Sequence, residues 1–440
     1  MPTLENKIKQ KTARIGVVGL GYVGLPLAVE YAAKGFETVG IEVDMNKINA
    51  INAGKNYIDD VDNKIFAKVT KNGKLKAVPD YEGVGKLDVI FICVPTPFTP
   101  NKEPDISYIV AAANEIGPRM RKGQLIVLKS TTFPNTTEGY VQPILEKSGL
   151  KTGKDFYLAF SPERIDPGNK KWTTANTPTV VGGVTPECTR LACLVTAQAV
   201  AKVVAVSSPK VAELEKLLEN IFRSVNIALA NELAQLCDRM GGINVWEVVD
   251  AAATKPFGFM PFYPGPGIGG HCILIDPYYL SWLAREYDFQ TNFITLAAET
   301  NENMPFYVKN MVQREISMMP VTFQDAKIVV LGVAFKRDVD DIRHSPALKV
   351  MELLLTDGAK NIVYNDPFVP SVRVNNHVFE SVELTKKLIA DADCVLITTD
   401  HSQYDYEMVV KNAKRVVDTR NATRAVKKGR EKVVLLWDGK

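Results

Sequence analysis

The sequence contains few of the residues that build metal sites and disulfide frameworks. Among 440 residues there are 6 cysteines and 4 histidines, and no two cysteines form a CxxC pair. Structural zinc sites gather Cys and His ligands at short spacings, and disulfide frameworks belong to short, cysteine-rich secreted chains. We therefore expect no metal site, and we expect the cysteines to be free thiols in a reducing compartment.

The sequence also lacks long apolar runs and a large net charge, and these two absences exclude further classes of protein. No apolar run approaches the roughly 18 residues that a membrane helix needs, and residues 1–21 lack the apolar core of a signal peptide. The formal net charge is only +3, and no long block of Lys and Arg occurs. The sequence therefore predicts a cytoplasmic protein with neither a membrane nor a nucleic-acid partner.

What the chain does contain is an alternation of short apolar runs and helical patterns near both ends. A chain of 440 residues is too long for one ordinary core, and such alternation is typical of parallel sheets with helices on both faces. We predict an α/β fold with two Rossmann-like, doubly wound domains, at 1–208 and 321–440. The expected strands are 14–18, 37–44, 87–95 and 123–131 in the first domain, and 326–336, 360–367, 393–400 and 414–421 in the second.

The middle of the chain has a different pattern. Residues 209–240 carry apolar side chains every three or four positions, which predicts one helix on the order of 40 Å long. We therefore expect a helical central domain over 209–320 that joins the two sheets. This helix is longer than one small domain requires. Such a helix also suits a subunit interface, so we expect a homodimer.

A glycine-rich turn follows the first expected strand. The stretch "GLGYVG" supplies Gly19, Gly21 and Gly24 between a strand and a helix. In a dinucleotide-binding fold such glycines permit a tight turn, close approach of a pyrophosphate, and close packing of helix on strand. Glu42 ends the next strand at the distance expected for a ribose-binding carboxylate. A carboxylate there repels a 2′-phosphate, so we expect NAD rather than NADP, with Asp44 as the rival acidic residue.

A second loop rich in glycine and proline, "GPGIGGHCILID", occupies residues 265–276. Its Cys272 is either an activated nucleophile or a small buried hydrophobic residue. Asp276 follows four residues later and is an acid–base group, or an N-cap or first-turn acid of the next helix, or both at once. The residues alone leave both choices open.

Polar residues also recur on one side of the predicted long helix. Lys216 and Asn220 are four residues apart and share a face, and Asn231 lies three turns further on nearly the same side. Asparagine is a poor helix former, so two asparagines on this mostly apolar helix require a reason.

Several stretches together resemble one enzyme family. They are "GLGYVGLPLA", "CVPTP", "KST" with "PNTTE", "SPERIDPG", "KLLENIFRSVNIALANE", "GGHCILID" and "GVAFKRDVDDIRHSP", in this order. From about residue 13 to 422 the chain resembles the nucleotide-sugar 6-dehydrogenases of the UDP-glucose/GDP-mannose dehydrogenase family. The stretch "KPFGFMPFYPGPGIGGHCILIDPYYL" is similar to the branch acting on UDP-N-acetylhexosamines, especially UDP-N-acetylglucosamine 6-dehydrogenases.

The resemblance implies a four-electron oxidation of the sugar C6 alcohol to a carboxylate with two NAD⁺ and one water. In the family, Cys272 matches the nucleophile that forms a thiohemiacetal and then a thioester. Asp276 matches the acid–base aspartate, and Lys216 and Asn220 match the groups that stabilise charge on the C6 oxygen.

Two more residues match the family's chemistry. Thr131 is expected beside the nicotinamide and the catalytic water, unless it competes with Ser130 and Thr132 as a helix cap. Glu163 is expected to act in thioester hydrolysis, unless it forms an ion pair with Arg164 or another arginine.

The expected binding residues form two sets. NAD contacts, beyond the glycines and Glu42, are expected from Tyr22, Val23, Thr96, Ser130, Thr131 and Arg343. Contacts to the UDP-sugar are expected from Glu163, Arg164, Lys216, Asn220, Gly269 and Lys336. Asp366 in "YNDPFV" is expected to form a turn at a strand end rather than a second ribose site.

The chain departs from the family pattern at a few positions. His344 stands where glutamate is common, Leu274 replaces a proline, and His271 marks the acetamido-sugar branch. We expect UDP-N-acetylglucosamine as the substrate, with uronate production for a surface polysaccharide or glycan. UDP-N-acetylmannosamine, UDP-N-acetylgalactosamine and UDP-glucose are the alternatives.

Overall fold

The computed structural model describes residues 2–58, 60–99, 101–165, 169, 171–270 and 272–437. The chain divides into two compact units. The first unit comprises residues up to 219 together with 278–288, and the second comprises 220–277 and the chain from 289 onward. The helices expected to form one central domain are therefore divided between the two units.

The first unit is built on an eight-stranded sheet in the order β3-β2-β1-β4-β5-β6-β7-β8. Neighbouring strands are parallel except for β6 and β7. The first six strands follow the order of a doubly wound dinucleotide-binding fold, which confirms the predicted fold class. The strands are β1 (Arg14–Val18), β2 (Glu37–Ile41), β3 (Leu75–Val78), β4 (Val89–Ile92), β5 (Leu125–Leu128), β6 (Tyr157–Phe160), β7 (Thr179–Gly183) and β8 (Val203–Val206).

Helices cover both faces of this sheet. Along β5, Leu125 and Val127 join one apolar cluster while Ile126 and Leu128 join another, because successive side chains of a strand point to opposite faces. Helices α2 and α7 contribute to the first cluster, and α5 and α6 to the second. The helices are α1 (Leu4–Lys9), α2 (Gly24–Ala33), α3 (Met45–Asn52), α4 (Asn63–Lys71), α5 (Ser107–Ile116), α6 (Gln142–Glu146) and α7 (Pro186–Thr196).

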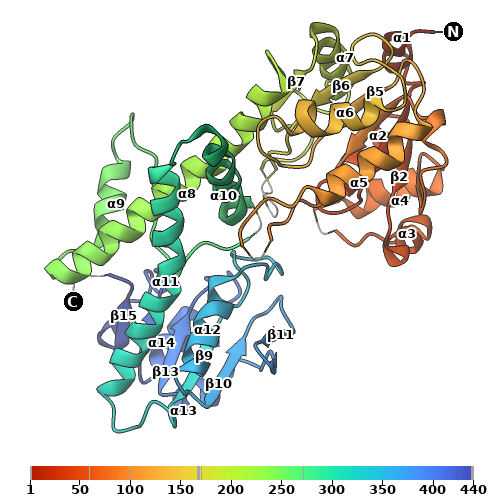
Figure 1. Ribbon diagram of the computed structural model, residues 1–440. Coiled ribbons are helices and arrows are strands. Elements are labelled where there is room, and N and C mark those ends of the chain that lie inside the picture. Colours follow the sequence, from red (N-terminus) through yellow and green to blue (C-terminus); the bar gives the residue numbers. More distant parts are fainter. Residues whose placement is uncertain are drawn as a thin grey trace. The chain divides into compact units, whose positions relative to one another are not determined.

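The second unit contains a five-stranded, fully parallel sheet in the order β10-β9-β13-β14-β15. Helices α11 and α12 pack on one face (Figure 1), and α13 and α14 pack on the other. The strands are β9 (Lys327–Leu331), β10 (Asn361–Asn365), β13 (Cys394–Ile397), β14 (Val416–Asp418) and β15 (Val433–Leu435), with a hairpin of β11 (Ser371–Val374) and β12 (His377–Glu380). The helices are α9 (Val245–Ala253), α11 (Asn292–Ser317), α12 (Pro346–Thr356), α13 (Lys386–Asp391) and α14 (Tyr406–Asn412).

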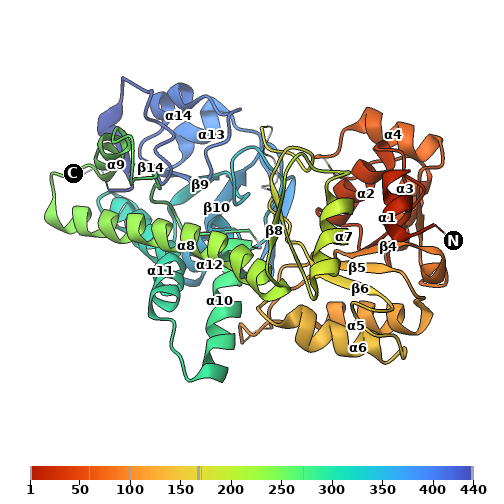
Figure 2. The ribbon, with the colours of Figure 1, turned by 90° about the horizontal axis from the view of Figure 1, so that it is seen from above.

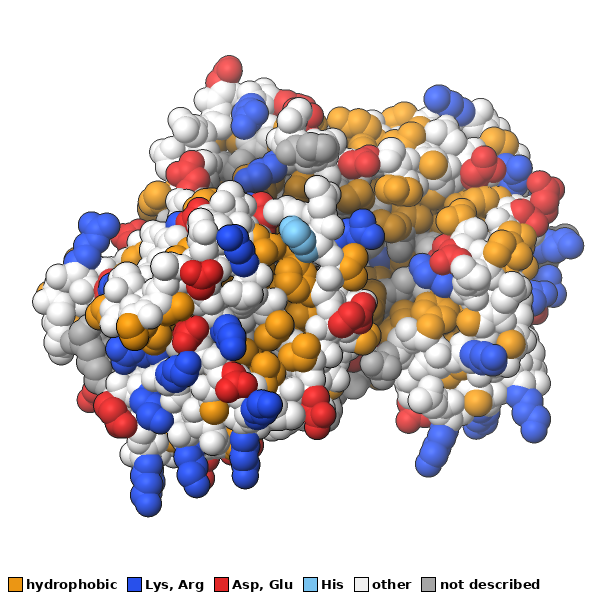
Figure 3. Space-filling view, turned by 90° about the horizontal axis from the view of Figure 1, so that it is seen from below, with side chains coloured by type: hydrophobic (Ala, Val, Ile, Leu, Met, Phe, Trp, Pro, Cys, Tyr) orange, Lys and Arg blue, Asp and Glu red, His pale blue; other side chains and the backbone are white. Residues whose placement is uncertain are grey.

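Two helices carry candidate site residues across the division between the units. Helix α8 (Pro209–Met240) has 32 residues and is one continuous helix (Figure 2), as the sequence predicts. Helix α10 (Cys272–Ala284) begins at the cysteine of the glycine-rich loop. None of the described helices is both long enough and apolar enough to cross a membrane. On the face shown in Figure 3, basic and acidic side chains are interspersed.

Candidate active site

The glycine turn after β1 has the geometry that its spacing predicts. Gly19 has φ +84°, and a Cβ there would lie 2.8 Å from the carbonyl oxygen of Cys93. A Cβ on Gly24 would lie 1.8 Å from the carbonyl oxygen of Gly19, whereas a Cβ on Gly21 would meet nothing within 4 Å. Packing therefore requires glycine at 19 and 24, and the backbone at Gly21 is open to a ligand. This open turn at the start of α2 fits the pyrophosphate of NAD.

The turn lies where the strand order of the first sheet reverses, between β1 and β4. Open α/β sheets bind ligands at this point. The side chain of Tyr22 is half exposed, and Val23 directly precedes α2. Thr96 follows β4 and is buried, and its carbonyl oxygen accepts a hydrogen bond from Tyr279. The contacts of these residues with NAD stay predictions.

Glu42 lies directly after β2, but its carboxylate is engaged by the protein itself. One oxygen accepts the backbone N–H of Leu20 at 2.9 Å, and the other accepts that of Val43 at 2.9 Å. Lys47 lies 3.7 Å from the same carboxylate. Glu42 thus ties the end of β2 to the glycine turn, and its ribose contact stays a prediction. The rival Asp44 is the N-cap of α3.

The segment after β5 places three hydroxyl side chains in a row. Ser130 donates to the carbonyl oxygen of Val94 at 2.7 Å, and the hydroxyls of Thr132 and Thr136 lie 2.7 Å apart. Thr131 lies between these two fixed residues and is half-buried. This places Thr131 at the carboxyl end of β5, on the edge of the sheet that binds ligands in such folds.

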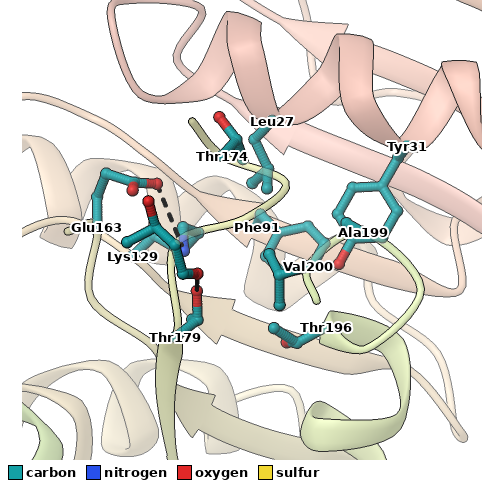
Figure 4. Close-up of a pocket in the computed structure, with 11 residues that line it drawn as sticks. Leu27, Tyr31, Phe91, Lys129, Glu163, Thr174, Thr179, Thr196, Ala199 and Val200 are labelled. Atoms are coloured by element: carbon teal, nitrogen blue, oxygen red, sulfur yellow. Dashed lines mark hydrogen bonds and ion pairs between the residues drawn. The ribbon is translucent and has the colours of Figure 1, made fainter. Parts of the chain in front are cut away.

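Glu163 is fixed through both oxygens of its carboxylate, and Figure 4 shows the ion pair that one of them forms with Lys129. Oε1 accepts the backbone N–H groups of Arg164 at 2.8 Å and Ile165 at 3.0 Å. Oε2 lies 3.8 Å from Nζ of Lys129, whose side chain is 6% exposed. The sequence reasoning missed Lys129, although a lysine that ends a fully buried apolar strand is itself an unusual feature.

Arg164 does not pair with Glu163 through its side chain. Its guanidinium donates to the carbonyl oxygen of Pro178 at 2.8 Å and to Glu219, and it lies 3.6 Å from Glu215. Burial, together with a hydrogen bond to Glu219, raises the pKa of Glu215 to about 7. Arg164 therefore joins the loop to α8, and its contact with substrate stays a prediction.

Helix α8 buries both polar residues that the sequence predicts for charge stabilisation. Lys216 is 7% exposed and Asn220 is 5% exposed, so the interpretation of Lys216 as a solvated surface lysine is wrong. In the second unit, Asn220 Nδ2 donates to Asp276 Oδ2 at 2.5 Å. The structure thus brings together two residues that are 56 positions apart.

Asp276 is one helical turn from Cys272. Since α10 begins at Cys272, Asp276 lies inside the helix, and the alternative that it caps the helix is wrong. Residues four apart on a helix share a face. Asp276 is 2% exposed. His271 and the side chain of Cys272 lie outside the described part of the chain.

The glycines before Cys272 are required by close packing within the second unit. A Cβ on Gly269 would lie 2.5 Å from Cβ of Phe335 and 3.0 Å from the carbonyl oxygen of His344. Gly270 has φ +82°, and its backbone N–H donates to the carbonyl oxygen of Arg343 at 2.9 Å. The loop is therefore pressed against the segment that follows β9.

That segment carries Lys336, at the point where the strand order of the second sheet reverses between β9 and β13. Asp366 Oδ2 accepts the backbone N–H groups of Val333 at 2.7 Å and Ala334 at 3.0 Å. It also accepts Nε2–H of the buried His401 at 3.0 Å, because Nδ1 of that ring accepts the backbone N–H of Asp338. Asp366 therefore forms a strand-end turn, as expected, and holds the segment in place.

Two arginines lie near this edge. Arg343 forms an ion pair with Asp341 at 2.6 Å. Arg420, which the sequence reasoning missed, donates to the carbonyl oxygen of Thr398 at 3.0 Å, and a Cβ on Gly265 would lie 2.8 Å from its guanidinium. Its position two residues after the strand "VVD" was the signal that could have identified it, since ligands bind at strand ends.

Comparison with known proteins matches all three parts of the chain to one family. Residues 13–200 match the NAD binding domain of the UDP-glucose/GDP-mannose dehydrogenase family, 210–303 its central domain, and 329–425 its UDP binding domain. A UDP-N-acetyl-D-mannosamine dehydrogenase of Pyrococcus horikoshii is 35% identical over 93% of this chain and 95% of the relative. A UDP-N-acetyl-D-glucosamine 6-dehydrogenase of Pseudomonas aeruginosa is 34% identical over 90% of this chain and 92% of the relative.

A solved structure gives the same result for the fold. The UDP-D-ManNAc dehydrogenase of Pyrococcus horikoshii matches with a TM-score of 0.86 at 33% identity, covering 96% of this chain and 98% of that one. The three consecutive domain matches and these relatives show that the chain belongs to the UDP-glucose/GDP-mannose dehydrogenase family and is an NAD-dependent nucleotide-sugar dehydrogenase.

Proposed function

We propose that this protein oxidises the C6 alcohol of a UDP-N-acetylhexosamine to the carboxylate through a covalent intermediate on Cys272. The observation that carries the proposal is the contact between Asn220 of α8 and Asp276, which lies one helical turn from Cys272 on α10. Helix α8 also buries Lys216. A buried amide, carboxylate and ammonium suit a reaction that moves protons and creates charge on oxygen. Bound NAD supplies the chemistry of accepting a hydride.

In the first half of the reaction, the C6 alcohol loses a hydride from carbon and a proton from oxygen, which gives the aldehyde. We assign Lys216 and Asn220 to the stabilisation of negative charge on the C6 oxygen. The thiolate of Cys272 then adds to the aldehyde carbon, and the oxygen takes a proton to form the thiohemiacetal. This adduct keeps the carbon in place for a second oxidation.

In the second half, the thiohemiacetal loses another hydride and its hydroxyl proton, which leaves a thioester. Water attacks the thioester, the C–S bond breaks, and the carboxylate and the free thiol are released. We assign Asp276, fixed by Asn220, to orient or deprotonate the water. Glu163, fixed by Lys129, and Thr131 are assigned to the same step.

The identity of the sugar is proposed from the relatives. We place UDP-N-acetylmannosamine first, because both the 35% identical relative and the structure with a TM-score of 0.86 carry that name. UDP-N-acetylglucosamine, the sugar expected from the sequence, is second, because a 34% identical relative acts on it by name. The uronate of either sugar suits a surface polysaccharide.

A panel of UDP-sugars tests this assignment. Purified protein with NAD⁺ is given UDP-N-acetylmannosamine, UDP-N-acetylglucosamine, UDP-N-acetylgalactosamine or UDP-glucose, and NADH is followed at 340 nm. We expect the highest kcat/KM with an N-acetylated sugar, and with the mannosamine epimer first. Turnover of UDP-glucose alone would overturn the proposed substrate class.

We also propose that two copies associate through α8. The apolar side chains on this helix that remain exposed recur at intervals of three, four or seven residues, and this pattern suits packing against a second helix. They are Val211, Leu214, Leu218, Phe222, Leu229, Leu233, Leu236 and Met240. Sedimentation at micromolar concentration is expected to give a dimer, and Leu218→Glu is expected to give a monomer. A wild-type monomer would contradict the proposal.

A further inference from the structure

Asn231 is a buried polar residue of α8 to which the proposed reaction assigns no role. Its side chain is fully buried, with 0% of the residue exposed. A primary amide in the interior is costly unless its hydrogen bonds are satisfied. The partners of Asn231 therefore indicate why this position is polar.

Those partners join two helices to the loop before Cys272, all within the second unit. Asn231 Oδ1 accepts the backbone N–H of Gly265 at 3.0 Å. Asn231 Nδ2 donates to Asn301 Oδ1 of α11 at 2.9 Å. Asn301 Nδ2 in turn donates to the carbonyl oxygen of Ser224 at 3.0 Å. Because Ser224 also belongs to α8, Asn301 is hydrogen-bonded to this helix at two positions.

The loop that receives this hydrogen bond is stiff at Pro266 but flexible at its glycines. Gly267 has φ +133° and Gly270 has φ +82°, and glycine imposes the weakest backbone preference of any residue. The opposite side of the loop rests on Phe335 and on the carbonyl oxygen of Arg343. The loop is thus held between the amide of Asn231 and the segment that follows β9.

A small cavity of about 10 Å³ adjoins the loop at Ile268. Its lining includes Ile268 of the loop, Leu274 and Pro277 of α10, and Asn301. If the hydrogen bond to Gly265 were lost, Ile268 could shift toward this space. The hydrogen bonds of Asn231 and Asn301 therefore hold in place a loop whose packing is incomplete only beside this cavity.

We propose that Asn231, held by Asn301, is a positioning residue that fixes the loop at 265–270 and thereby sets the position of the start of α10, where Cys272 lies. The inference rests on the proposed function, in which Cys272 is the nucleophile. A reactive group that is displaced by about 1 Å can lose on the order of a hundredfold in rate. Asn231 itself touches the loop backbone and not the reacting atoms.

The test compares Asn231→Ala with Asn226→Ala, a matched control on the same helix. Asn226 donates to the carbonyl oxygen of Phe222 at 2.7 Å within α8. For each variant, kcat, both KM values, the melting temperature and the rate of Cys272 alkylation by iodoacetamide are measured. Peptide mass spectrometry identifies alkylation at Cys272.

We expect Asn231→Ala to lower kcat on the order of tenfold to a hundredfold and to change the alkylation rate of Cys272, while both KM values stay within about twofold because no binding group is removed. Asn226→Ala is expected to match the wild type in all of these. If Asn231→Ala does not fold, Asn301→Ala is measured instead, and its kcat and alkylation rate are expected to change in the same direction. The double variant is expected to be no worse than Asn231→Ala, because the two residues act as one unit.

Unchanged kcat and alkylation in a folded Asn231→Ala or Asn301→Ala protein would overturn the inference. Cys272→Ser, assayed alongside, separates this outcome from failure of the proposed function. If Cys272→Ser retains full turnover, the proposed function is wrong. If Cys272→Ser is inactive and the asparagine variants behave like wild type, only the positioning role is wrong.

Discussion

The two sheets shape the loops at the carboxyl ends of their parallel strands by different means. In the first unit, the turn after β1 is shaped by backbone contacts, since Gly24 packs directly on the carbonyl oxygen of Gly19. In the second unit, the segment after β9 is held by side chains, chiefly Asp366 and the buried His401. One unit thus presents bare backbone to a ligand, and the other presents a tethered segment that bears Lys336 and Arg343.

Because of this difference, we expect the two sites to be sensitive to different kinds of substitution. A site made of backbone depends on the absence of a side chain, so adding a single methyl group should damage it. A site made from side-chain tethers depends on satisfied buried hydrogen bonds, so removing an acceptor should damage it. The following predictions use this contrast, from the largest expected effect to the smallest.

Gly24→Ala is expected to have the largest effect in the first unit. The new Cβ would lie 1.8 Å from the carbonyl oxygen of Gly19, and relief of such overlap typically costs on the order of 2–3 kcal/mol of stability. Gly21→Ala is the matched control, because its Cβ meets nothing within 4 Å. Urea unfolding and NADH titration should show Gly24→Ala destabilised and deficient in binding, and Gly21→Ala fully stable but with weaker NADH binding. Equal unfolding midpoints for the two variants would contradict the packing argument.

Asp366→Ala is expected to have the next largest effect, in the second unit. It leaves the N–H groups of Val333 and Ala334 without their acceptor, which typically costs about 1–3 kcal/mol. Calorimetric titration should show weaker binding of UDP, while NADH binding by the first unit stays unchanged. Asp391→Ala, which removes an exposed carboxylate from α13, serves as the control. Loss of NADH affinity in Asp366→Ala would show that the loops are not independent.

The pH dependence of stability is also expected to differ between the units. Its effect on the free energy of unfolding is expected to be smaller than the effects of the two substitutions above. The pKa of Glu215 rises from 4.5 to about 7 in the folded chain, so its stabilising contribution is complete below about pH 4.5 and is lost as pH rises toward 7. Burial works to raise the pKa of Asp366, but hydrogen bonds from His401 and the backbone outweigh it and hold the pKa below 3.8. The contribution of Asp366 is therefore present above pH 3.8 and is lost only as the pH falls through its folded pKa.

Urea unfolding at pH 4.5 and at pH 7 checks these opposite signs. Relative to Glu215→Gln, the wild type should lose about 1–2 kcal/mol between these values, less than the pKa difference alone implies because Glu215 is partly exposed. The difference between wild type and Asp366→Asn should stay constant over the same range. A constant difference for Glu215→Gln would contradict the assignment.

The sequence predicted those features that depend on neighbouring residues. The helix over 209–240 follows from its apolar spacing, and the turn at Gly19 follows from a strand, three glycines and a helix in succession. The antiparallel pairing of β6 and β7 was not predicted, because short strands carry no signal of direction. The hairpin of β11 and β12 was also missed, since its strands have only four residues each.

Within the candidate site, the missed features are contacts between residues distant in the chain. Lys129 forms an ion pair with Glu163, which lies 34 positions later in the sequence, and Asn231 donates a hydrogen bond to Asn301, which lies 70 positions later. Periodicity shows which face of a helix a residue occupies, but not what packs against that face. The structure was needed to reveal that Asn231 holds the loop before Cys272, and that Arg164 turns toward α8.

The central claim is that Cys272 carries the sugar between two oxidations. The most direct test counts NADH formed per UDP-N-acetylhexosamine consumed, for the wild type and for Cys272→Ser, with substrate binding measured separately. We expect two NADH per sugar from the wild type, and lost turnover with intact binding from Cys272→Ser. Two NADH per sugar at an unchanged rate from Cys272→Ser would contradict the thioester route.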